Sequence, residues 1–321
     1  MIETRTRAAF ERMVTSGAGD AGALASGLRR EVTGVGLRAL AAKLLHVAIC
    51  DPSRMADVYD NAANGWLNGP VFAPNFRGAT ALAPSDDFWR TLWDVMDVPA
   101  ASRQRVAFAE EIMRLAGLLS PELNVRAAAA ARDVRGVGSA ASSGLPTRPF
   151  DPDRLAAYPP STLGGMLRLE MAARGRTGEI AGADELGLAD LPAPLDYTNA
   201  RALQCHLIWA VVGGYSAGQL DDIALAAFQM GQFRHPFSAL VVGLTVMTIA
   251  IDRPQGLELV LDSIFKGWMH GRETPLLLGV DWEGLMGLQL EAVRDRLHVR
   301  AFESPMAAAL RKWSEGRGPA N

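Results

Sequence analysis

The chain of 321 residues carries a formal net charge of −3, and 49% of its residues are apolar and 21% charged. These proportions are typical of an ordered globular protein and argue against a disordered one. Because basic and acidic residues are interspersed, and phosphate neutralisation needs clustered cations, the sequence predicts no nucleic-acid partner.

The first helices are expected before residue 70. Residues 1–20 carry several charges and lack the apolar stretch of a secretory signal, so we expect a cytoplasmic protein. Apolar residues at spacings of three and four mark a helix that ends near Cys50. A second helix is expected from about Pro52 to Leu67, where Asn-Gly-Pro follows as a stop signal.

A loop and a short group of helices follow. Residues 71–84 contain turn-forming residues, and two or three helices are expected between Ser85 and Arg135. The stretch 136–152 is rich in Gly, Ser and Pro, which predicts either a linker or a lid over a pocket. We therefore divide the chain into an N-terminal helical region, 1–150, with an insertion and this loop, and a helical core, 151–321.

The second half is also helical in pattern. Helices are expected at about 162–174, 199–213, 218–233, 236–250, 254–270, 282–296 and 305–315. The longest apolar run, Phe237–Ile251, has 15 residues and is shorter than the roughly 20 that a membrane-spanning helix needs. Alternating β-branched runs are absent, and a disulfide framework is not expected because Cys50 and Cys205 lie in apolar helical stretches. The sequence predicts an all-α fold.

Three stretches of the second half resemble the Coq4 family of ubiquinone biosynthesis. The first runs from Tyr158 to Met171 (YPPSTLGGMLRLEM), and the last from Gly271 to Leu285 (GRETPLLLGVDWEGL), followed by LEAVRDRL. The middle one surrounds Gly214-Tyr215. Residues 39–69 resemble the family more weakly, and residues 71–150 look like an addition. The resemblance implies a Coq4-like multi-helix bundle with an extra N-terminal helical region.

The middle stretch corresponds to the metal motif of that family, His-Asp-x-x-His followed by Glu. Aligned on Gly214-Tyr215, His206 matches the first His, while Leu207 and Ala210 replace the Asp and the second His. Asp222 is a shortened equivalent of the Glu. Since one imidazole and one carboxylate leave most of a coordination sphere to water, the sequence predicts no bound metal and no cofactor.

His206 and Asp222 are the candidate catalytic residues, with two interpretations open. They form either a hydrogen-bonded pair left from an ancestral metal site or an acid and base that face a ligand. The candidate substrate-binding residues share their helices or the later motif, and they are Trp209, Ala210, Tyr215, Gln229, Gln232 and Arg272. Arg272 would meet a ligand carboxylate or phosphate, or else brace a helix end.

The resemblance implies a protein that binds a hydrophobic small molecule, polyprenyl, quinone-like or polyketide, between the helices at 199–213 and 218–233. The first hypothesis is a repurposed metal-independent biosynthetic enzyme such as a cyclase, which works by orientation and proton transfer. The alternatives are a non-catalytic lipid-binding scaffold and a ubiquinone-pathway decarboxylase or hydroxylase with an altered metal site. Peripheral contact with a membrane and a homodimer are left open.

Overall fold

The computed structural model describes residues 4–70, 80–98, 105–175, 187–252 and 256–305. Within these ranges the chain forms fifteen α-helices and no strand, which confirms the all-α prediction. The helices are α1 Thr4–Ser16, α2 Ala21–Arg30, α3 Gly34–Ile49, α4 Met55–Trp66, α5 Asp86–Asp97, α6 Arg105–Gly117, α7 Pro121–Arg132, α8 Val137–Ala141, α9 Pro152–Leu155, α10 Leu163–Ala173, α11 Leu195–Gly213, α12 Gln219–Phe233, α13 Pro236–Asp252, α14 Leu257–Glu273 and α15 Leu290–Leu297.

Two expected elements differ in the structure. The helix predicted at 282–296 is a short 3-10 turn, Glu283–Leu285, followed by α15. The stretch 136–152 is not a continuous loop, because it contains α8, whose Val137 and Ala140 side chains are buried in an apolar cluster. The helix expected at 305–315 lies almost wholly outside the described residues.

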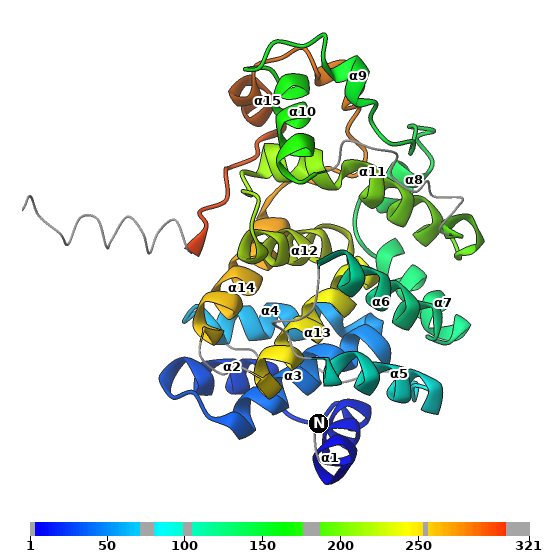
Figure 1. Ribbon diagram of the computed structural model, residues 1–321, viewed down its shortest axis with the longest axis vertical. Coiled ribbons are helices and arrows are strands. Elements are labelled where there is room, and N and C mark those ends of the chain that lie inside the picture. Colours follow the sequence, from blue (N-terminus) through cyan, green and yellow to red (C-terminus); the bar gives the residue numbers. More distant parts are fainter. Residues whose placement is uncertain (1–3, 71–79, 99–104, 176–186, 253–255, 306–321) are drawn as a thin grey trace, which may run out of the picture.

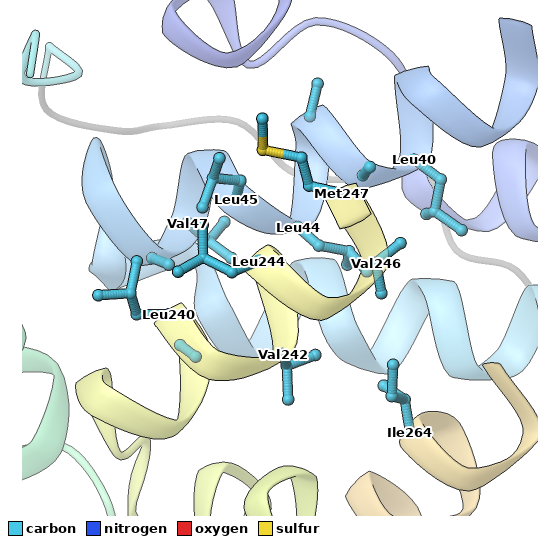
Figure 2. Packing of buried hydrophobic residues seen from close by; sticks show 14 of the residues in the cluster. Leu40, Leu44, Leu45, Val47, Leu240, Val242, Leu244, Val246, Met247 and Ile264 are labelled. Atoms are coloured by element: carbon cyan, nitrogen blue, oxygen red, sulfur yellow. The ribbon is translucent and has the colours of Figure 1, made fainter. Parts of the chain in front are cut away.

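The larger apolar cluster fills the end of the molecule that holds the first helices (Figure 1). Its centre is the contact between α3 and α13, where Leu44 and Leu45 face Leu240 and Leu244 (Figure 2). Both helices are apolar almost all round, and a helix of that kind is stable in water only when it is buried. Because α13 belongs to residues 151–321 and α3 to 1–150, this cluster takes residues from both expected regions. The division of the chain at residue 150 stays a prediction.

A second cluster lies towards the other end, where α9, α10 and α15 are seen together in Figure 1. It holds side chains of α10 and α11 and of the segment from Leu277 to Val299. Helix α12 contributes to both clusters, since Ile223 and Met230 lie in the first and Leu225 and Phe228 in the second. The helix that carries Asp222 and Gln229 is therefore the shared wall between the two cores.

Glycines bring α12 and α14 unusually close together. A Cβ atom added to Gly267 or Gly271 would lie 2.3 Å from the carbonyl oxygen of Ala224 or Phe228, respectively. One added to Gly231 would lie 2.6 Å from the Trp268 oxygen. Only hydrogen fits at such distances, so these glycines set the spacing of the two helices.

No helix among the described residues has both the length and the apolar content needed to cross a lipid bilayer. The apolar run in α13 is buried against α3, and this contact accounts for its hydropathy. Both cysteines are buried free thiols.

Candidate functional site

A tight turn joins the two helices that carry the predicted site. Helix α11 is capped by Gly214, which has a left-handed φ of 77°, and the Tyr215 amide donates back to the Ala210 carbonyl at 2.9 Å. Helix α12 begins after Gly218, and the buried Asp221 carboxylate accepts from the Ser216 amide at 2.8 Å. The Ser304 hydroxyl donates to the other Asp221 oxygen at 2.7 Å. The carboxylate thus ties the turn to the C-terminal segment.

His206 on α11 faces Gln229 on α12. The imidazole is half-buried, and its Nδ1 lies 3.1 Å from the Gln229 amide nitrogen. Asp222 lies seven residues before Gln229, which is about 10 Å along a helix. Among the described side chains, no hydrogen bond or ion pair connects His206 with Asp222. The expected pair is therefore not formed, because the helices place a different α12 position opposite His206.

Asp222 is paired with a cation that the sequence did not single out. Arg174, at the C-terminal end of α10, donates to the Asp222 carboxylate and to Glu170. Its other terminal nitrogen donates to the Ser216 carbonyl at 3.3 Å. The Arg174 side chain is only 6% exposed, and its two carboxylate partners raise its pKa. Asp222 thus holds α10 against the start of α12.

Gln229 is part of a buried chain of polar groups. Its carbonyl oxygen accepts from the Ser238 hydroxyl at 2.8 Å, and Ser238 Oγ lies 2.7 Å from His235 Nδ1. Three of the four side chains are buried, and burial lowers the pKa of His235 to about 3. His235 is therefore neutral at neutral pH. The chain links α11, α12 and the start of α13.

Gln232 is buried and holds the turn that follows α14. Its amide nitrogen donates to the carbonyls of Gly271 at 2.9 Å and Thr274 at 2.8 Å, and its oxygen accepts from the Leu277 amide at 2.8 Å. It is 5% exposed. Because these contacts use both ends of the amide, Gln232 fixes the turn after α14 in place of the ligand contact we expected.

Arg272 also braces the fold. Its guanidinium lies 3.2 Å from Asp60 on α4 and 6.0 Å from the ring centre of Trp268. The Trp268 indole donates to the same Asp60 carboxylate at 2.8 Å. Together with the Gly271 contact, this pairing gives the Gly-Arg motif a role in joining α14 to its neighbours. Arg272 was predicted either to contact a ligand or to brace a helix end, and the structure shows the second role.

Three of the predicted binding residues are buried in the second cluster. Trp209, Ala210 and Tyr215 are each at most 2% exposed. The Trp209 ring packs on Phe233 at 5.6 Å between centres. The Tyr215 hydroxyl lies 2.6 Å from His270 Nδ1, and burial raises the pKa of that tyrosine.

An apolar cleft lies on the next face of α11, towards α10. It is lined by Pro149, Phe150, Leu167, Met171, Leu203, Gln204 and Leu207. The cleft holds about 10 Å³, room for one water molecule. It lies between α10, α11 and the 149–150 segment, whereas the sequence predicted a pocket between α11 and α12. Leu207, which stands at the position of the family's Asp, is one of its walls.

A buried arginine supports the wall that Phe150 forms. Arg201 is 2% exposed and donates to the carbonyls of Pro146 at 2.8 Å and Leu278 at 3.2 Å. It also donates to Gln204, which lines the cleft. From α11, the Arg201 side chain thus holds the loop segments at Pro146 and Leu278 beside the cleft.

In the part of the chain that the structure describes, no three His, Cys, Asp or Glu side chains come together as a possible metal-ligand set. His206 and Asp222 are held by Gln229 and Arg174 instead.

Comparison with solved structures shows that this fold has been seen before. The chain is similar to a crystal structure from Nostoc punctiforme PCC 73102, a protein provisionally described as a ubiquinone biosynthesis protein. The sequences are 22% identical, the TM-score is 0.51, and the match covers 67% of this chain and 98% of the other. No protein-family model and no curated protein sequence matches the chain. The likeness shows a shared fold.

Proposed function

We propose that this protein binds a hydrophobic small molecule in the cleft between α10 and α11. The observation that carries the proposal is the composition of the cleft, whose walls are apolar except for Gln204. Binding sites for small molecules combine apolar walls with a few polar groups that fix orientation. The ubiquinone-related description of the protein from Nostoc punctiforme favours a polyprenyl or quinone-like ligand over other apolar molecules.

Binding requires the cleft to widen. A volume near 10 Å³ admits no organic ligand, so at least one wall has to move. Met171 and Phe150 are suited to this, since an unbranched thioether repacks easily and Phe150 lies on a segment without regular structure. The ligand would then lie among these side chains and Leu203 of α11, which line the same cleft.

The chemistry we propose is a metal-independent conversion, such as a cyclisation, with His206 as the group that moves a proton. His206 precedes Leu207 of the cleft, about 100° around the helix, and is half-buried on α11. Folding an apolar chain into a reactive conformation lowers a barrier by orientation, and one imidazole then suffices for proton transfer. Asp222 would act by holding Arg174 and α10 in place.

A carrier without catalysis is the second candidate. It is favoured by the pairing of Asp222 with Arg174, because this engages the acid that the acid–base interpretation placed beside His206. A carrier needs only the cleft.

The binding test uses a short-chain prenylated benzoquinone and native mass spectrometry. Leu203→Trp places an indole in the cleft, and Leu169→Trp is the matched control, because Leu169 on α10 is 54% exposed. We expect saturable binding by the wild type and the control, and at least tenfold weaker binding by the Leu203 variant. Equal binding by all three, or none by the wild type, would refute the cleft as the site.

The same complex separates an enzyme from a carrier. An enzyme converts a bound prenylated ring to a product of changed mass or retention time, and His206→Ala slows this conversion while binding persists. A carrier returns the ligand unchanged with either chain. Wild-type conversion rates in the His206 variant would remove the role proposed for the imidazole.

A further inference from the structure

The four polar side chains that begin at His206 form one directional relay. Their order is His206, Gln229, Ser238 and His235, and each neighbouring pair is within 3.1 Å. Pro236 opens α13, which places His235 just before the helix and Ser238 in its first turn. The relay therefore runs from a half-buried imidazole through α12 to a fully buried one.

We propose that His235 and Ser238 are positioning residues that decide, through Gln229, which ring nitrogen of His206 carries the proton. Their functional meaning rests on the role proposed above for His206. Neither residue contacts the cleft, since neither is among its lining side chains.

The hydrogen-bond directions leave two self-consistent arrangements. In the first, His235 Nδ1–H donates to Ser238, and the Ser238 hydroxyl donates to the Gln229 oxygen. The Gln229 amide then donates to His206 Nδ1, which must be unprotonated. His206 in its neutral form thus carries its proton on Nε2 and offers a donor there.

The second arrangement reverses every donor. The Gln229 amide is flipped, its nitrogen donates to Ser238, and the Ser238 hydroxyl donates to His235 Nδ1. The Gln229 oxygen now accepts from His206 Nδ1–H, so that Nε2 of a neutral His206 is left with a lone pair and can accept a proton. One arrangement places the proton of a neutral His206 on Nε2, and the other places it on Nδ1.

Intermediate arrangements are excluded by burial. If both Nδ1 atoms carried a proton, an N–H of Gln229 would point at an N–H of His206. Flipping the Gln229 amide would relieve this conflict only by making the Ser238 oxygen accept two hydrogen bonds, and the Ser238 hydroxyl hydrogen would then lose its acceptor, the Gln229 oxygen. If neither Nδ1 atom carried a proton, two lone pairs would face each other. Gln229, Ser238 and His235 are each at most 6% exposed, so water does not relieve such a conflict. The relay consequently allows one, and only one, of the two Nδ1 atoms to be protonated.

The test is the tautomeric state of the two histidines in the full-length protein. Long-range proton–nitrogen NMR correlations of chain labelled with ¹⁵N-histidine distinguish a protonated from an unprotonated ring nitrogen, and single His→Asn variants assign the signals. We expect His206 and His235 to differ at Nδ1 in the wild type. Two protonated or two unprotonated Nδ1 atoms would overturn the proposal.

Three variants test the coupling itself. Ser238→Ala removes the hydroxyl that links the two halves, and we expect the Nδ1 signal of His206 to move towards a mixture of the two tautomers. Ser238→Thr keeps a hydroxyl and should restore the wild-type signal. Ser263→Ala is the control, because the Ser263 hydroxyl is buried and has no hydrogen-bond partner among the described residues.

The outcomes separate this proposal from the proposed function. A His206 signal that is the same in the wild type and in Ser238→Ala overturns the relay while leaving binding to the cleft unaffected. Loss of quinone binding by the wild type, with the tautomers coupled as expected, removes the ligand and leaves the relay in place.

Discussion

Gln232 offers the sharpest test of how the turn after α14 is held. The substitution Gln232→Met keeps the length of the side chain and removes both polar ends. Three hydrogen bonds of 2.9 Å or less are lost, to Gly271, Thr274 and Leu277. The site is 5% exposed, so water does not replace these partners.

The expected loss of stability follows from the number of bonds. Each buried hydrogen bond contributes about 1 kcal/mol net, so we expect the free energy of unfolding to fall by about 3 kcal/mol. Unfolding entropy of about 2.1 cal/mol/K per residue over 321 residues converts this to a fall in melting temperature of about 4–5 °C.

Urea unfolding followed by circular dichroism measures the change. Gln219→Met is the matched control, since Gln219 is exposed on the same helix, and it should lie within about 0.5 kcal/mol of the wild type. If the Gln232 variant were as stable as this control, the bonds to the turn would not be holding it. If the Gln232 variant bound the quinone as tightly as the wild type, this would support a structural role for the side chain over a role in ligand binding.

Two further predictions concern packing and pH. Gly271→Ala should cost about 1–3 kcal/mol in thermal or urea unfolding, because its Cβ would meet the Phe228 carbonyl at 2.3 Å. Gly27→Ala on α2, where a Cβ has open space, should instead stabilise by up to about 1 kcal/mol; the same sign for both would contradict the packing argument. Burial holds the pKa of His235 at about 3 in the folded chain, below its ordinary 6.5. The contribution of the neutral His235 to the free energy of unfolding is therefore full above pH 6.5 and is lost as the pH falls towards 3. Between pH 7.5 and pH 5, His235→Gln should lose about 2 kcal/mol less stability than the wild type, measured by urea titrations at both values; parallel losses would show that His235 takes up a proton while the chain is folded.

The sequence predicted the positions of the two site helices well, but it did not predict which side chains contact each other between them. Periodicity predicts which residues of α11 share a face, and His206 and Asp222 were correctly placed on neighbouring helices. Which α12 residue lies opposite His206 depends on the turn at Gly214 and on the packing of α12 against α14. A shift of seven residues along one helix separates Gln229 from Asp222 and does not disturb the apolar pattern.

Arg174 and Ser238 show why some site residues were missed. Arg174 follows the end of α10 and meets Asp222 across 48 positions of the chain. Ser238 carries no signal in the sequence beyond a hydroxyl in the first turn of an apolar helix, and its bond to Gln229 depends on how α13 leaves α12. The pattern Pro236-Phe-Ser after a histidine could have indicated a helix start. It could not have indicated the relay, because the relay also includes side chains of α11 and α12.

The sequence by itself determined the all-α class and most of the helices of the second half, because periodicity and short motifs are local properties. Only the tertiary structure decided that His206 faces Gln229, that Asp222 pairs with Arg174 and that a cleft lies between α10 and α11. These contacts depend on the distance and register between helices, which glycines such as Gly271 set through backbone contacts that no side-chain pattern records.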